Sequence, residues 1–161
     1  MAATEINYIP FSEIVPKDFA RMLNNHKIRA HLVEHALFNE ESLAAWMREK
    51  IAVDATKGCR VRGILVNVQL AGWCGIQLEQ ETSNNEEMYE VAIVLDQKYW
   101  GIGKQVFQEM MRWAKDLGHN EIFIHFLETR REYLFLKKIA KQVFESERLG
   151  RRFTTYRLSV Q

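Results

Sequence analysis

Residues 88–118 constrain the fold more than any other part of the chain, because they combine a strand, a glycine turn and a helix. Met88–Leu95 is a short, mostly apolar run with β-branched residues, which is typical of a largely buried strand. The next eight residues end in Gly101-Ile102-Gly103, and glycines allow a ligand to come close to the backbone. A strand followed by such a turn indicates a ligand-binding edge of a sheet.

A helix is predicted directly after this turn. Apolar residues recur there at the spacing of one helix face: Ile102, Val106, Met110, Trp113, Ala114 and Leu117. Gly118 stands where a C-terminal glycine cap belongs. The free N–H groups and positive dipole end at the start of such a helix favour an anion, above all a phosphate.

Known nucleotide motifs fit this turn poorly. The dinucleotide fingerprint requires a third glycine where Val106 stands. The P-loop requires GK[ST] after a four-residue spacer, and the sequence contains no such string. An ordinary strand-turn-helix connection with two glycines is the remaining simple alternative.

Length and composition favour one domain spanning residues 1–161. The net charge of +1 gives no indication of a nucleic-acid or membrane-surface partner. No apolar run approaches the roughly 20 residues of a membrane span, and the N-terminus lacks a signal-peptide pattern. We therefore expect a cytoplasmic protein, with Cys59 and Cys74 as free thiols.

Hydrophobic periodicity and turn residues predict the other elements. Strands are expected at residues 6–10, 63–69, 73–78, 121–127, 142–147 and 153–160, and helices from Pro16, over 27–37, after Asn39 and over 130–140. The second and third strands should form a hairpin around Leu70-Ala71-Gly72, and residues 79–87 should form a loop. This order predicts an α/β protein with a mixed sheet flanked by helices.

The stretch Val94–Phe107 resembles the acetyl-CoA motif Q/R-x-x-G-x-G/A of the GNAT N-acetyltransferases. Lys98 takes the Q/R position, and Gly101 and Gly103 take the two small positions. Counting forward from the strand instead places Trp100 at the Q/R position and Gln105 at the last small position.

The string Tyr99-Trp100-Gly101 is similar to the branch that contains the ribosomal-protein N-terminal acetyltransferases. The order of elements resembles the GNAT order over essentially the whole chain. The resemblance implies a GNAT-like fold, in which the central strand and the next one are parallel but splay apart to admit acetyl-CoA. It assigns cofactor binding to Ile93, Val94, Leu95, Lys98, Trp100, Gly101, Ile102, Gly103, Lys104, Gln105, Thr129, Phe135 and Lys138.

The same resemblance implies direct attack of a neutral amine on the thioester. A base must remove a proton from the amine, and Glu90 is the first candidate because it is a charged residue within an apolar strand. The alternative is that Glu90 faces solvent. Glu128 is the second candidate and His125 the third. The tyrosine that often protonates the leaving thiolate is replaced by Leu136, which leaves Tyr133 as the nearest acid.

These observations predict an N-acetyltransferase that moves an acetyl group from acetyl-CoA to a primary amine of a small molecule, a peptide or a protein N-terminus. A catalytically silent acyl-CoA-binding or regulatory module is the alternative, and a small nucleotide-binding or interaction domain is a third. Apolar edge strands in the C-terminal hairpin favour a homodimer. The H-x-x-E-H string of His31, Glu34 and His35 is interpreted as chance, and no metal is expected.

Overall fold

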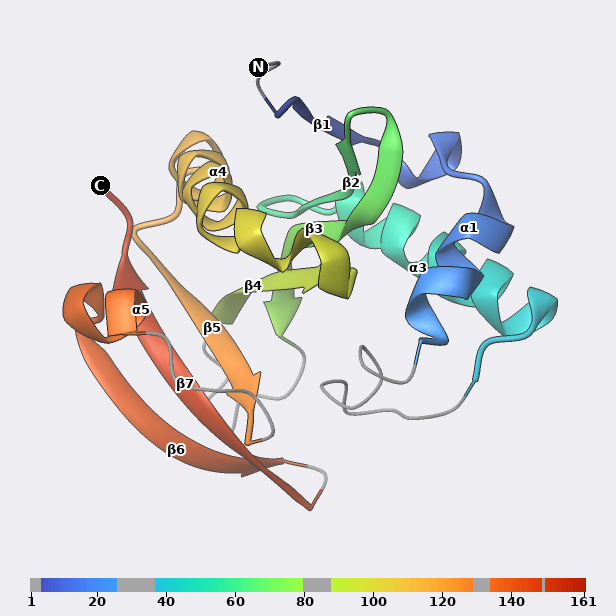
Figure 1. Cartoon of the computed structure of the whole chain (residues 1–161). Coiled ribbons are helices and arrows are strands. Elements are labelled where there is room, and N and C mark those ends of the chain that lie inside the picture. Colours follow the sequence, from blue (N-terminus) through green and yellow to red (C-terminus); the bar gives the residue numbers. More distant parts are fainter. Residues whose placement is uncertain (1–3, 26–36, 80–87, 129–133, 149) are drawn as a thin grey trace.

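One mixed sheet organises the part of the chain that the computed structural model describes, which is residues 4–25, 37–79, 88–128, 134–148 and 150–161. Its seven strands lie in the order β1-β2-β3-β4-β5-β7-β6 (Figure 1). Neighbouring strands are antiparallel except β4 and β5, which are parallel. The strands are β1 Ile6–Ile9, β2 Arg60–Val66, β3 Gln69–Glu79, β4 Met88–Leu95, β5 Glu121–Leu127, β6 Gln142–Arg148 and β7 Arg151–Ser159. The predicted α/β class with a mixed sheet is confirmed.

Helices connect and cover these strands, and none of those in the described residues is long and apolar enough to cross a membrane. They are η1 Phe11–Glu13, α1 Pro16–Leu23, α3 Glu40–Asp54, η2 Gln97–Ile102, α4 Gly103–Asp116 and α5 Leu134–Ile139. Asn39 caps α3 as predicted, because its side chain accepts a hydrogen bond from the backbone N–H of Ser42 at 2.8 Å. The helix expected over residues 27–37 lies almost entirely outside the described residues.

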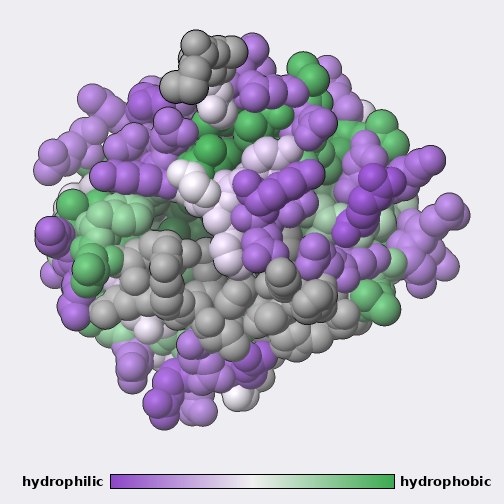
Figure 2. Space-filling view, in the orientation of Figure 1, coloured by the Kyte–Doolittle hydropathy of each residue, from purple (hydrophilic) through white to green (hydrophobic). Residues whose placement is uncertain are grey.

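Two apolar layers hold the helices on opposite faces of the sheet (Figure 1). On one face, α4 packs Val106 and Met110 against strand residues such as Ile76 and Ile122. On the other face, α1 and α3 surround an aromatic group: Phe11, Phe19, Trp46 and Trp73. Hydrophilic residues cover most of the surface in Figure 2, with hydrophobic residues in smaller groups. The two layers fix which strand residues face which helices.

The parallel strands β4 and β5 pair over a short distance and then separate. Their register contains Glu90 opposite Phe123 and Val91 opposite Ile124. Beyond these pairs, residues 92–95 of β4 keep β3 as their neighbour, while β5 continues beside β7 (Figure 1). The splayed central sheet expected from the resemblance is confirmed, and beyond Val91 one side of the β4 backbone has no strand partner in the part of the chain that the structure describes.

The turn between β2 and β3 lies elsewhere than predicted. Asn67 and Val68 form it, with φ angles of 47° and 67°. Two residues with positive φ are typical of a tight hairpin turn, and asparagine suits such a position, but a β-branched residue is rare there, so Val68 hid the turn. Gly72, expected in the turn, lies inside β3 instead, and β3 extends to Glu79, which was expected in a loop.

Replacing Val68 with glycine should stabilise the protein by about 1 kcal/mol, since the left-handed conformation is unfavourable for a side chain with a Cβ. Val68 is 83% exposed, so little apolar burial is lost. The midpoint of thermal unfolding should rise by about 2–4 °C. The same substitution at Val143, in the extended backbone of β6, should lower it. A lower midpoint for Val68→Gly would contradict the turn assignment.

Replacing Gly72 with alanine should destabilise the protein by about 3 kcal/mol or more. A Cβ at this position would lie 2.0 Å from the carbonyl oxygen of Val94 on β4, and neither backbone can move without disturbing the sheet. Urea unfolding measures the loss. Gly101→Ala is the matched control, because its Cβ would have nothing within 4 Å. Equal stability of the two variants would show that the strands are not so closely spaced.

Candidate active site

The glycine turn lies at the C-terminal end of β4, where η2 leads directly into α4. The indole N–H of Trp100 donates to the carbonyl oxygen of Leu95 at 3.0 Å and so holds η2 against the strand end. No side chain caps the first turn of α4. The N–H of Gly103 donates to the carbonyl oxygen of Trp100 within η2, so the N–H groups that follow it in the first turn of α4 are the ones that an anionic ligand can reach.

Gly101 and Gly103 leave open space in front of this turn. Among the described residues, a Cβ at Gly101 would have nothing within 4 Å, and one at Gly103 would approach only Leu95, at 3.9 Å. Neither glycine is therefore required by internal packing. Their missing side chains instead leave room for a ligand at the helix start.

The predicted end of the helix is confirmed. Gly118, with φ of 87°, follows the last turn of α4. The N–H of His119 donates to Ala114 at 2.9 Å and that of Gly118 donates to Lys115 at 3.0 Å. This is the Schellman arrangement, and it anchors the end of α4 remote from the glycine turn.

Helix α5 lies beside the first turn of α4. The rings of Phe107 and Phe135 are 5.6 Å apart, and the Lys104 ammonium is 5.8 Å from the Phe135 ring centre. Lys98 lies over the Tyr99 ring, and Lys138 is exposed on α5. Most of the cofactor residues named from the sequence are thus at or next to one strand end.

Two residues assigned from the sequence cannot be placed, and a third position is buried. Thr129 and Tyr133 lie outside the described residues. Leu136, which replaces the tyrosine of the family pattern, is 1% exposed and belongs to the apolar core. Its position can supply neither a hydroxyl nor a solvent-facing proton donor.

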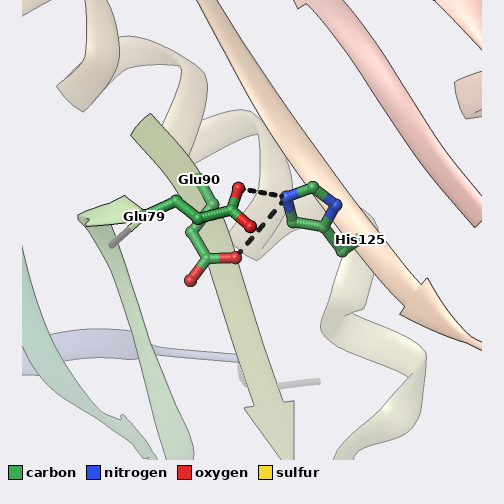
Figure 3. Close-up of side chains that lie close together, drawn as sticks. All are labelled: Glu79, Glu90 and His125. Atoms are coloured by element: carbon green, nitrogen blue, oxygen red, sulfur yellow. Dashed lines mark hydrogen bonds and ion pairs between the residues drawn. The ribbon is translucent and has the colours of Figure 1, made fainter. Parts of the chain in front are cut away.

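A polar cluster lies on the sheet face that α1 and α3 cover. Val91 and Ile124 contribute to the α4 core, and strand side chains alternate between faces. Glu90 and His125 therefore share the opposite face, together with Glu79 from β3. Figure 3 shows both carboxylates directed at the imidazole.

Hydrogen bonds fix the two functional side chains. The side-chain amide of Gln77 donates to Oε1 of Glu90 at 2.9 Å, and the ammonium of Lys50 on α3 donates to Oε1 of Gln77 at 2.7 Å. Nε2 of His125 is hydrogen-bonded to Oε2 of Glu79 at 2.9 Å, and its Nδ1 to the hydroxyl of Thr155 at 2.7 Å. Six residues from α3 and four strands therefore form one network, joined where Nε2 of His125 lies 3.7 Å from Oε2 of Glu90.

Burial controls the charges of this network. It lowers the pKa of His125, whose side chain is 8% exposed, and the Glu90 carboxylate acts in the opposite direction. Burial also lowers the pKa of Lys50, against the carboxylates of Glu49 and Glu90. At neutral pH the imidazole of His125 is thus predominantly neutral.

The second base candidate lies apart from this cluster. The Glu128 side chain, just after β5, is 48% exposed and lies 3.5 Å from the guanidinium of Arg151.

Gln77 and Glu79 are members of the cluster that the sequence patterns did not predict. The alternation of Trp73, Gly75, Gln77 and Glu79 with apolar residues was the signal that could have identified them, had β3 been extended to its observed end.

A family model places the chain among known enzymes. The model of the Acetyltransferase (GNAT) family matches residues 22–134, which is more than half of the chain. The chain belongs to the GNAT family of acetyltransferases. Comparison with curated protein sequences finds no significant match.

Solved GNAT structures have the same fold over nearly the whole chain. A GNAT-family acetyltransferase of Bordetella pertussis superposes with a TM-score of 0.77 at 11% identity, covering 99% of this chain and 98% of that one. YncA of Salmonella typhimurium, solved with its cofactor acetyl-CoA, gives 0.71 at 11% identity, with 99% and 95% covered. Ribosomal-protein-alanine N-acetyltransferase of Brucella melitensis gives 0.70 at 10% identity, with 96% and 99% covered. At these identities the likeness establishes the fold alone.

As a GNAT enzyme, the protein is an N-acetyltransferase with acetyl-CoA as its co-substrate. Its own residues fit that molecule. The uncapped start of α4 and the space at Gly101 and Gly103 suit a diphosphate. The β4 backbone beyond Val91 has no β5 partner and suits the amides of a pantetheine arm.

Proposed function

We propose that the protein acetylates a primary amine by direct attack within a ternary complex, with Glu90 as the general base. The observation that carries this proposal is the place of Glu90, at one of the last paired positions before β4 and β5 separate. Its side chain is 22% exposed, so an amine can reach it. A protonated amine has no lone pair, and a carboxylate at this position can remove the proton.

Gln77 positions the base. Its amide donates to one oxygen of the Glu90 carboxylate, and Lys50 in turn fixes the amide from the other side. The second oxygen of Glu90 lies on the side of His125, at 3.7 Å from Nε2. A carboxylate held in this way needs little reorganisation to accept a proton.

The backbone of β4 supplies a donor for the oxyanion. The N–H of Asp96 donates to Ala71 of β3 at 2.7 Å, and backbone groups alternate along a strand, so Val94 also faces β3. Ile93 and Leu95 consequently face the side where β5 has diverged. Leu95 is five residues from Glu90, about 16 Å along a strand, so the N–H of Ile93, nearer to the base, is the one we assign to the oxyanion.

Acetyl-CoA supplies an acetyl group on a thiol that leaves readily. Since Leu136 is buried, the thiolate takes its proton from Tyr133 or from water, and thiols have a pKa near about 8.5. The same substitution favours the second candidate function, a silent acyl-CoA-binding module. Turnover separates the two, because a silent module binds acetyl-CoA without releasing the thiol.

The acceptor is a small-molecule, peptide or protein amine. The string Tyr99-Trp100-Gly101 favours a protein N-terminus, as in the ribosomal-protein branch. Thiol release from acetyl-CoA, measured with N-terminal peptides, polyamines, aminoglycosides and amino acids, tests the proposal. Rapid release with one acceptor class, together with an acetylated product, is expected. Binding of acetyl-CoA without release for any class would favour the silent module.

The homodimer expected from the C-terminal hairpin stays a prediction. β6 is the outer strand of the sheet, and Val143 on it is 39% exposed. An edge strand with an exposed apolar residue can pair with a second copy. Sedimentation equilibrium measures the state directly, and a monomer at all concentrations would contradict it.

A further inference from the structure

Glu79, Glu90 and His125 bring three metal-binding atoms together. Nε2 of His125 lies 2.9 Å from Oε2 of Glu79 and 3.7 Å from Oε2 of Glu90, and all three ligand atoms fall within 4.8 Å of one another (Figure 3). Within the described ranges, no other three His, Cys, Asp or Glu side chains converge in this way. The three residues belong to β3, β4 and β5, so paired backbone fixes their spacing.

The observed separations match a tetrahedral ion. Zn²⁺ binds histidine nitrogen and carboxylate oxygen at about 2.0–2.2 Å, which places tetrahedral ligand atoms about 3.4 Å apart. The two distances from Nε2 lie on either side of this value. The third separation, between the two carboxylates, is within 4.8 Å, so rotation of the glutamate side chains would complete three ligand positions. Three protein ligands leave a fourth position open.

Neighbouring side chains hold the ligands in orientation. Thr155 is fully buried, and its hydroxyl lies 2.7 Å from Nδ1 of His125. In the tautomer that protonates Nδ1, this hydroxyl accepts the hydrogen bond and the lone pair of Nε2 is free for a metal. The amide of Gln77 fixes the other oxygen of Glu90. Such outer partners are typical of metal-binding histidines and carboxylates.

We propose that Glu79, Glu90 and His125 bind one Zn²⁺, and that the bound ion blocks acetyl transfer by occupying the Glu90 carboxylate. The ion takes the place of the hydrogen bond between Glu79 and Nε2, and the neutral imidazole then keeps its one proton on Nδ1, facing Thr155. The inhibition rests on the proposed role of Glu90, whereas the binding does not. Mg²⁺ should not replace Zn²⁺, because it prefers six oxygen ligands and retains its water.

Calorimetric titration of the chelator-treated full chain with Zn²⁺ tests the binding. The wild type should bind one ion, and His125→Asn and Glu79→Gln should each weaken binding by at least about 100-fold, since loss of an outer partner alone costs up to that factor. Acetyl-CoA binding by both variants shows that they are folded. His31→Asn/His35→Asn is the control, because it removes the H-x-x-E-H string and should leave Zn²⁺ binding unchanged.

Three results would overturn the binding site: no one-to-one binding by the wild type, wild-type affinity in His125→Asn, or loss of binding in the His31/His35 control. The inhibition has a separate readout. Zn²⁺ should inhibit the wild type at the concentrations at which it binds, and His125→Asn should tolerate at least about 100-fold more. Zn²⁺ that binds at this site without inhibiting would refute the block and the role of Glu90 as base.

Discussion

Gly101→Glu/Gly103→Glu should lose acetyl-CoA binding by at least about 100-fold while its stability stays within about 0.5 kcal/mol of the wild type. The expected loss has two causes. Both new side chains enter the space in front of α4, where a Cβ meets nothing of the protein itself closer than 3.9 Å. They also place carboxylates at the position expected for a diphosphate, and like charges repel strongly at short range.

Titration calorimetry with acetyl-CoA and desulfo-CoA measures this effect, and thermal unfolding measures stability. Gln108→Glu is the matched control, because it adds a carboxylate to an exposed position further along α4. It should bind both compounds as the wild type does. Unchanged affinity in the double glycine variant would remove the helix start from the cofactor site.

Glu90→Gln should lower kcat by about 10²- to 10⁴-fold, which is the usual contribution of a general base. A glutamine has nearly the same shape and can still accept the hydrogen bond from Gln77, so the fold and acetyl-CoA binding should be preserved. Steady-state kinetics with the best acceptor from the amine panel separates kcat from KM. An unchanged KM for acetyl-CoA would locate the loss in the chemical step.

Glu128→Gln is the matched control for this prediction. Glu128 is also a carboxylate and follows β5 directly, but it is exposed and lies beside Arg151. Its substitution should change kcat by less than about 2-fold, since surface changes have small effects. The reverse pattern, with activity lost in Glu128→Gln and kept in Glu90→Gln, would transfer the role of base to Glu128.

Local sequence patterns predicted strand β4, the glycine turn and helix α4 well. The run from Met88 to Leu95 and the apolar stripe of α4 carry their periodicity within a single segment, and Gly118 ends the helix by its own conformation. The turn at Asn67 and Val68 escaped prediction because valine adopts positive φ against its own preference. Tertiary pairing of β2 with β3 imposes that conformation.

The polar cluster could not be predicted from local sequence, because it depends on how distant strands pair in the sheet. Glu79 and His125 are 46 residues apart in sequence, and they meet only because β3 pairs with β4 and β4 with β5. No local pattern contains this information. Glu90 could be selected from its own strand, whereas its neighbour Gln77 required the β3–β4 register.

A crystal structure with bound acetyl-CoA would locate the cofactor and the reacting carbonyl together. We expect the diphosphate at the backbone N–H groups at the start of α4, the pantetheine amides along the open side of residues 92–95, and the thioester on the Glu90 side of the splay. Acetyl-CoA bound outside the gap between β4 and β5, or with its thioester directed away from Glu90, would contradict this expectation.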